Sequence, residues 1–181
     1  MRVALLSVLD SQADPRRVPA PFRMLAGARL VDRQLDIALA AGCETIACLA
    51  NTVGREVIDL QHRAEAAGAR FIAIREPRKL SGIVTANDEL LVLAPGVLPD
   101  EDAVMRHLAK PCVLVFPADP AVQRGYERID LHFAWAGALV VRGTAVEQLA
   151  QLPGDVDTPS ALLRIALQSG VRTHPLETRL L

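Results

Sequence analysis

The sequence predicts an α/β protein: a three-layer sandwich in which helices cover both faces of a mostly parallel sheet. Two observations carry this prediction. Short apolar runs alternate with longer segments in which apolar residues recur at helical spacing, and the runs are nearly continuous, as in strands buried on both faces. The 181 residues, 51% of them hydrophobic, suit one domain over 1–181 that buries roughly 70% of its unfolded surface.

The first half of the chain alternates strand and helix patterns. In chain order, we expect a strand over 3–9, a helix over 30–41, a strand over 45–50, a helix over 54–67 and a strand over 70–74. Between the first two elements, residues 10–21 contain three prolines, which regular structure does not tolerate. Gly42 and Gly68 follow the two helices as stop signals. A series of alternating strands and helices predicts a parallel sheet in which the helices form right-handed crossover connections.

The second half of the chain continues the alternation. The expected elements are strands over 90–94 and 112–116, extended chain over 129–141, a short last strand over 171–174, and helices over 100–109, 143–151 and 159–169. Pro153 and Gly154 separate the last two helices. No repeat, low-complexity tract or linker divides the sequence.

Composition excludes several classes of function. Twenty basic and twenty-one acidic residues leave no broad basic field, so we expect no nucleic-acid partner. No apolar segment reaches the roughly 20 residues of a membrane span, and the opening run is too short for a signal peptide, so we expect a cytoplasmic protein without a membrane partner. Cys43, Cys48 and Cys112 lack metal spacing and are expected to be buried, reduced thiols.

Four segments carry a family resemblance. They are LAGARLVDRQL at 25–35, LVLAPGVLPD at 91–100, WAGALVV at 135–141 and DVDTP at 155–159. In this order and spacing they resemble nucleotidyltransferases with a GT-A-like (nucleotide-diphospho-sugar transferase) fold, including inositol-phosphate cytidylyltransferases and molybdenum-cofactor guanylyltransferase-like proteins. The resemblance spans most of the chain. It implies transfer of a nucleotide from a nucleoside triphosphate to a sugar or polyol phosphate, with release of pyrophosphate.

The resemblance implies a phosphate site in the loop after the first strand. Such a site needs backbone N–H groups and glycines that let the backbone approach the phosphates, yet no glycine precedes Gly27. The family lysine falls on Ala20, which leaves Arg23 as the candidate catalytic cation. The implied nucleotide-binding positions are Ser7, Val8, Arg16, Arg17, Ser81 and Gly82. The alternative for the two loop arginines is ordinary solvation at the surface.

The segment around Ser81 and Gly82 resembles the motif with which the family reads the base. Only seven residues separate Gly82 from Leu90. At ~1.5 Å per residue, this spacing allows at most about two turns of helix, so we expect a shortened base-binding edge.

A divalent cation, normally Mg²⁺, would neutralise the charge that develops during transfer. The family's strand-end aspartate falls on Gly96, so the implied metal ligands are Asp155 and Asp157, which point to the same side if this stretch is extended. The alternative is that Asp157 or Thr158 caps a helix whose first turn contains Pro159.

Two functions remain. The first is a catalytically degenerate nucleotidyltransferase domain, a pseudoenzyme that acts as a binding or assembly module. The second is an active nucleotidyltransferase that uses the arginines above and Mg²⁺. Losing both the lysine and the metal aspartate removes transition-state stabilisation, so the first explains more of the sequence. The expected partners are a nucleotide or phosphorylated small molecule and a homo-oligomer or larger assembly. Residues 133–136, with the only tryptophan, could join subunits or pack in the core.

Overall fold

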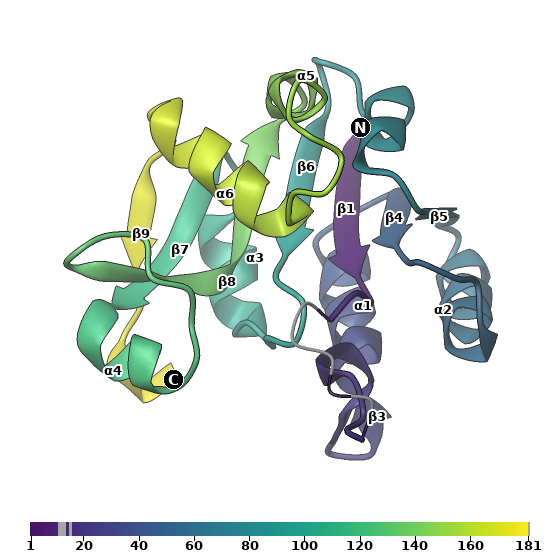
Figure 1. Ribbon diagram of the computed structural model, residues 1–181, viewed down its shortest axis with the longest axis horizontal. Coiled ribbons are helices and arrows are strands. Elements are labelled where there is room, and N and C mark those ends of the chain that lie inside the picture. Colours follow the sequence, from purple (N-terminus) through teal and green to yellow (C-terminus); the bar gives the residue numbers. More distant parts are fainter. Residues whose placement is uncertain (11–13, 15, 181) are drawn as a thin grey trace.

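The structure is a computed structural model that describes residues 1–10, 14 and 16–180. Its centre is a seven-stranded sheet with helices on both faces (Figure 1), which confirms the predicted α/β sandwich. In spatial order the strands are β5 (Arg70–Ile74), β4 (Thr45–Leu49), β1 (Arg2–Ser7), β6 (Glu89–Leu93), β8 (Phe133–Arg142), β7 (Cys112–Pro117) and β9 (Thr173–Pro175). The α-helices are α1 (Leu30–Ala40), α2 (Arg55–Ala66), α3 (Glu101–His107), α4 (Ala118–Gln123), α5 (Thr144–Leu149) and α6 (Thr158–Gln168).

The sheet separates two apolar layers, as the alternation of side chains along β1 shows. Ala4 and Leu6 pack in the layer beneath α1 to α4, whereas Val3 and Leu5 pack in the layer beneath α5 and α6. All four side chains are fully buried. A central strand must be apolar at every position when both of its faces are covered, which explains the near-continuous apolar run.

The topology places a crevice beside β1. This strand pairs in parallel with β4 and with β6, and β4 pairs in parallel with β5. β7 and β9 are also parallel, whereas β8 runs antiparallel to β6 and β7. The chain therefore moves outward from β1 in one direction and then returns to its other side with β6. In open α/β sheets, ligands bind outside the carboxyl ends of the strands at such a reversal.

Most helix boundaries follow the expected signals. α1 and α2 end just before Gly42 and Gly68, as expected. Asp100 caps α3, accepting a hydrogen bond of 2.7 Å from the backbone N–H of Ala103. The helix expected over 100–109 therefore begins after Asp100, which is its N-cap.

Several short elements differ from the expectation. The sequence did not indicate α4, the small hairpin of β2 (Met24–Leu25) and β3 (Ala28–Arg29), or the 3₁₀ turns η1 (Ala20–Phe22), η2 (Pro77–Gly82) and η3 (Thr178–Leu180). These elements have too few residues to show a periodic pattern. Residues 83–88 contain turns but no helix, in line with a shortened edge.

The burial of Trp135 and of the three cysteines tests two further expectations. Trp135 is only 3% exposed and packs in the layer beneath α5 and α6, so it belongs to the core and does not offer a surface for joining subunits. The three cysteines are free and buried, as expected.

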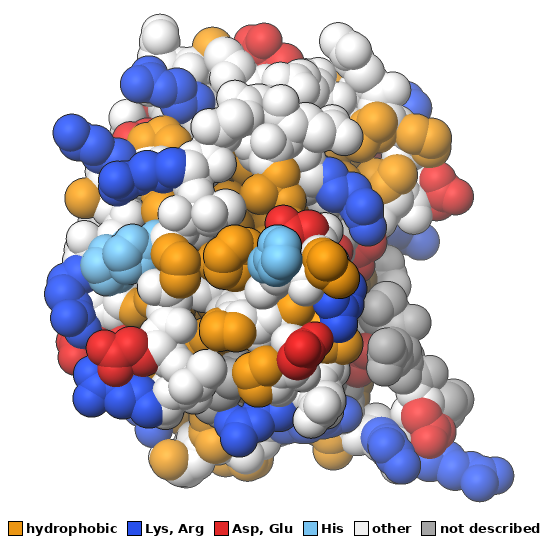
Figure 2. All heavy atoms as spheres, turned by 90° about the vertical axis from the view of Figure 1, so that its left-hand side faces the viewer, with side chains coloured by type: hydrophobic (Ala, Val, Ile, Leu, Met, Phe, Trp, Pro, Cys, Tyr) orange, Lys and Arg blue, Asp and Glu red, His pale blue; other side chains and the backbone are white. Residues whose placement is uncertain are grey.

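The exterior is chemically mixed beyond the β9 edge of the sheet. There, apolar, basic, acidic and histidine side chains intermingle on the face shown in Figure 2.

Among the helices that the structure describes, none is long and apolar enough to cross a membrane.

Candidate functional site

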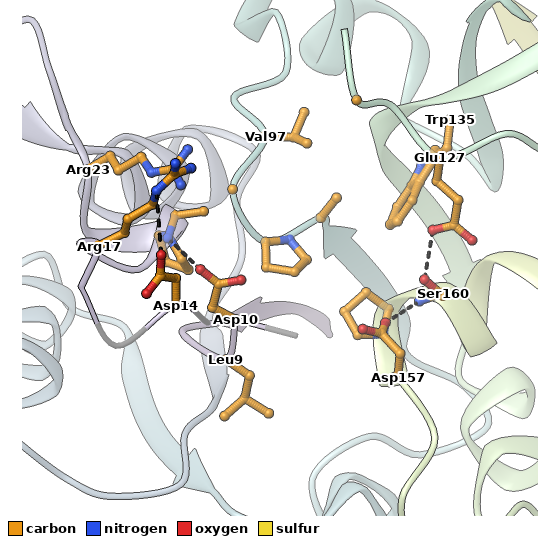
Figure 3. Close-up of a pocket in the computed structure, with 17 residues that line it drawn as sticks. Leu9, Asp10, Asp14, Arg17, Arg23, Val97, Glu127, Trp135, Asp157 and Ser160 are labelled. Atoms are coloured by element: carbon orange, nitrogen blue, oxygen red, sulfur yellow. Dashed lines mark hydrogen bonds and ion pairs between the residues drawn. The ribbon is translucent and has the colours of Figure 1, made fainter. Parts of the chain in front are cut away.

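Three cavities meet at the carboxyl ends of the parallel strands, where the topology predicts a ligand site. Leu9 and Asp10, which follow β1, line all three. The large cavity, of about 500 Å³, lies between the loop after β1, the turn after β6 and the start of α6 (Figure 3). The second cavity, of about 330 Å³, opens between the ends of β1, β4 and β5 and residues 154–159, and the third, of about 230 Å³, faces α2.

The first backbone N–H groups beyond β1 already donate hydrogen bonds within the protein. The N–H of Val8 donates to Leu49 O at 3.0 Å, and that of Leu9 donates to Ser7 Oγ at 3.2 Å. Farther along, the N–H of Ala20 donates to Asp10 Oδ2 at 3.0 Å. A phosphate cradle is made of backbone donors that point at the ligand. Here three such donors point at protein oxygens, one of them a carboxylate.

Ala20 and Gly96 both line the large cavity and lie against each other. A Cβ placed on Gly96 would lie 2.8 Å from the Cβ of Ala20, closer than real contacts of this kind. Gly96 also has a φ of +74°, a conformation that favours glycine. The sequence resemblance assigns the family lysine and metal aspartate to these two positions, which lie in one cavity. Neither has a functional side chain there.

Of the three predicted arginines, only two line the large cavity. Arg17 and Arg23 line the large cavity, whereas Arg16 lines none of the three cavities. Arg17 Nε lies 3.7 Å from Asp14 Oδ2. Arg23 Nε donates to Val18 O at 3.4 Å. Two guanidinium groups thus occupy the loop side of the cavity, one of them beside a carboxylate (Figure 3).

The two predicted acidic residues, Asp155 and Asp157, line different sets of cavities. Asp157 caps α6, with Oδ1 accepting a hydrogen bond from the backbone N–H of Ser160 at 3.0 Å, as the capping alternative predicted. Its carboxylate lines both the large and the second cavity, whereas Asp155 lines only the second of the three. Two carboxylates supply only part of the oxygen shell that Mg²⁺ takes. Among the residues described, no group of three or more metal-ligating side chains adds to it.

The remaining nucleotide-binding candidates lie apart from one another. Ser7 lines the second cavity, and its hydroxyl accepts from Leu9 N–H. Val8 lines the third cavity. Ser81 and Gly82 line none of the three, and the Ser81 hydroxyl donates to Arg78 O at 2.7 Å within η2. The base-binding motif is therefore not joined to the other candidates by these cavities.

Several other residues line these cavities without belonging to a family motif. Asn51 and Arg75 follow β4 and β5 and reach the second cavity, a placement that the strand-end rule could have indicated. Glu127 and Ser160 line the large cavity with Trp135. Glu127 precedes β8 in a loop without any motif, so only the tertiary structure identifies it.

The large cavity is acidic overall. Its lining contains four carboxylates, Asp10, Asp14, Glu127 and Asp157, against the two guanidinium groups of Arg17 and Arg23, which gives a formal charge of −2. A polyphosphate entering this cavity would meet net repulsion, which the partial screening near a surface reduces but does not remove.

Comparisons with known proteins identify the fold. No protein-family model and no curated protein sequence matches this chain. Among solved structures, a putative glucose-1-phosphate thymidylyltransferase from Bacillus anthracis, in complex with a sucrose, aligns with a TM-score of 0.69 at 10% identity, over 97% of this chain and 86% of that one.

Two pyrophosphorylases align in the same way. UDP-glucose pyrophosphorylase complexed with UDP-glucose aligns with a TM-score of 0.65 at 11% identity, over 98% of this chain and 91% of that one. The enzyme of the same name from Acinetobacter baumannii gives 0.63 at 12% identity, over 98% and 86%. The chain therefore has the fold of the sugar-phosphate nucleotidyltransferases, as its sequence motifs indicated.

Proposed function

We propose that this chain is a nucleotidyltransferase-like domain that has lost catalysis and serves as a binding or assembly module. The contact between Ala20 and Gly96 carries the proposal. In the active family these positions hold a phosphate-binding lysine and a metal-binding aspartate. In this chain the Ala20 side chain lies so close to Gly96 that a Cβ added at Gly96 would collide with it.

The size of the loss supports this proposal. Removing one group that stabilises charge in a transition state typically costs about 3–4 kcal/mol, a factor of about 100 to 1,000 in rate. Two such groups are missing. The effects of catalytic groups that act as a unit are not additive, but either loss alone is large.

The hydrogen bonds of the backbone after β1 also support the proposal of lost catalysis. A triphosphate would have to displace the hydrogen bonds that Leu9 and Ala20 donate to Ser7 and Asp10 before those donors could bind it. It would also enter a cavity whose lining has a formal charge of −2. We therefore propose that any physiological ligand, a nucleotide or phosphorylated small molecule included, binds without nucleotidyl transfer.

The proposal also includes a cellular location and an assembly partner. Buried free thiols suit the reducing cytoplasm, where we place the protein. For an assembly, the hairpin of β2 and β3 offers exposed apolar side chains, Met24 being 67% and Leu25 45% exposed. A homo-oligomer or a larger complex is the partner that such a surface would serve.

An active nucleotidyltransferase is the second candidate. One observation favours it: Arg17, Arg23 and Asp157 still line the large cavity, next to the positions of the missing groups. The similarity to UDP-glucose pyrophosphorylase complexed with UDP-glucose gives this candidate a substrate class. In this case Arg17 and Arg23 would bind the triphosphate, and Asp155 and Asp157 would hold Mg²⁺.

Pyrophosphate release separates the two candidates. The purified chain is incubated with each of the four ribonucleoside triphosphates, Mg²⁺ and a panel of sugar and polyol phosphates. We expect no pyrophosphate above the protein-free background. Steady release that the double substitution Arg17→Ala and Arg23→Ala abolishes would establish the active enzyme and end the proposal of lost catalysis.

A further inference from the structure

A stacked pair of histidines joins the last strand of the sheet to a helix on one of its faces. His107 is the last residue of α3, and His174 lies in the middle of β9. The centroids of their rings lie 3.7 Å apart, and the ring planes are 20° from parallel. Both residues are half-buried, and neither lines the three cavities of the candidate site. Figure 2 faces this edge of the molecule and shows histidine side chains at its surface.

β9 is a short edge strand, so each contact that holds it in place matters. Its three residues pair with β7, which is its one neighbour among the strands that the structure describes. At the start of the pairing, the N–H of Val113 donates to Arg172 O at 2.9 Å. At its end, the N–H of Leu176 donates to Val115 O at 2.8 Å, and the Leu176 side chain packs in the layer beneath α1 to α4. The histidine stack adds a side-chain contact from β9 to α3.

The charged groups that act on His107 are basic. Burial lowers the pKa of His107, and the positive charges of His174, Arg106 and Arg172 lower it further. Arg106 precedes His107 in α3, and Arg172 lies two residues before His174. Positive charge therefore reaches the ring from both elements that the stack joins. Within the described part of the chain, no carboxylate offsets this charge at His107.

The acidic side chains of the neighbouring elements are placed elsewhere. Glu101 and Asp102 lie in the first turn of α3, at the opposite end of the helix from the histidine. Beyond β9, Glu177 pairs with Arg179. β7 contributes the thiol of Cys112, whose pKa is raised by burial, so this group is neutral. α1, which also packs on α3, holds the carboxylates of Asp32 and Asp36 beside Arg63.

Protonation of the rings works against the contact between them. A histidine in an unfolded chain has a pKa of about 6.5. Because the pKa of His107 is lowered in the folded protein, the folded state binds this proton less readily than an opened state does. The contribution of the contact is therefore complete above about pH 6.5 and is lost as the pH falls below that value.

We propose that the stack of His107 on His174 is a pH-sensitive contact that fixes β9 at neutral pH and releases it on acidification. Below about pH 6.5 the rings gain positive charge, the stack opens and β9 loosens from β7. This uncovers the backbone edge of β7, and an unpaired strand edge can pair with another strand. The inference does not depend on the proposed function, because neither histidine lines the candidate site.

Amide hydrogen exchange, followed by NMR on the unmodified chain, tests the proposal. The N–H groups of Val113 and Leu176 report on the bonds between β7 and β9. The reference is the N–H of Ala50, which donates to Ile74 O at 3.0 Å at the other edge of the sheet. After correction for intrinsic exchange rates, protection of the two reporters should fall at least about threefold more than that of the reference between about pH 7.5 and about pH 5. An equal fall at the reference, unchanged protection of the reporters, or a rise on acidification would overturn the proposal.

Substitutions at the two rings and at their basic neighbours test the assigned groups. Phenylalanine can stack but takes no proton, so the pH response should shrink in His107→Phe and in His174→Phe and disappear when both are combined. The matched control is His62→Phe, the same change on an exposed part of α2, which should keep the full response. Arg106→Gln combined with Arg172→Gln should raise the pKa of His107, as NMR titration of its ring protons measures. A full pH response without either ring, or an unchanged pKa without the two arginines, would contradict the assignment.

Discussion

Gly96 and Ala20 lie against each other in the lining of the large cavity, although 76 positions separate them in the sequence. A Cβ on Gly96 would lie 2.8 Å from that of Ala20. Gly96 follows β6, and Ala20 begins η1 at the end of the loop after β1. Since β1 and β6 are parallel neighbours, the sheet itself brings these positions together. The end of this loop therefore leaves no space for a Cβ on Gly96.

The first prediction concerns the cost of a side chain at Gly96. Substitution Gly96→Ala introduces a Cβ at a φ of +74° and against Ala20. The left-handed conformation costs roughly 1–2 kcal/mol, and overpacking adds about 1–3 kcal/mol. We expect the free energy of unfolding to fall by about 2–4 kcal/mol in urea denaturation.

Two controls accompany this substitution. Gly154 has an ordinary φ, and a Cβ added there would meet no atom within 4 Å, so Gly154→Ala should change stability by less than about 0.5 kcal/mol. Adding Ala20→Gly to the Gly96 variant removes the steric part and should restore part of the loss. A Gly96→Ala protein as stable as the original would show that the contact is not tight.

The second prediction concerns Asp32 and acid stability. Asp32 Oδ2 accepts from Arg29 Nε at 2.8 Å, and Oδ1 lies 3.0 Å from Arg63 Nη1. Burial alone would raise the pKa of Asp32, but the hydrogen bonds and charges of the two arginines outweigh it and lower the pKa. A lowered pKa stabilises the fold above the unfolded value of about 3.9, and this contribution is lost as the pH falls below that value.

Asp32→Asn should therefore lower the free energy of unfolding by about 2–3 kcal/mol near neutral pH. The difference from the original protein should shrink below about pH 4. Asp36→Asn, which removes a more exposed partner of Arg63, should cost less than about 1 kcal/mol. Equal costs at Asp32 and Asp36, or a difference that does not change with pH, would refute this account of the network.

The sequence could predict most of the fold because the core signals are local. The apolar run of β1 is continuous because both faces are covered, and Asp100 and Asp157 stand where helices begin. α4 could not be predicted, because six residues containing Pro120 show no helical period. It forms because β7 delivers Ala118 and Ala121 to a buried position against the sheet.

The third prediction separates the two roles of Asp157. Its carboxylate caps α6, so Asp157→Ala should lower stability by about 1 kcal/mol in thermal or urea unfolding. Asp157→Asn should leave stability nearly unchanged, because the amide oxygen can accept the same hydrogen bond from Ser160. Equal losses in both variants would mean that the charge, and not the cap, stabilises the helix.

The fourth prediction concerns thiol reactivity. Burial raises the pKa of Cys43 and of Cys48 to about 12, and it also raises the pKa of Cys112. The thiolate is the reactive form. We therefore expect the folded protein to react with a thiol-specific disulfide reagent only as fast as it unfolds, and all three thiols to react promptly in denaturant. Rapid labelling of one thiol in the native protein would contradict the burial of that residue.

The candidate site was predictable only in part. Arg17, Arg23 and Asp157 could be named because the family motifs mark their positions, and all three line the large cavity. Glu127 could not, because the tertiary fold and not any spacing in sequence brings it to Ser160 of α6. Contacts between distant segments carry no local signal.

The most direct measurement for the central claim is the thermal midpoint of the unmodified chain with each of the four ribonucleoside triphosphates, with and without Mg²⁺. A ligand that binds only the native state raises this midpoint, by an amount that grows with the logarithm of the ligand concentration relative to its Kd. Because Ala20 lies against Gly96 and the N–H of Ala20 donates to Asp10, we predict no Mg²⁺-dependent rise. A rise of several degrees with one nucleotide and Mg²⁺ would contradict the account.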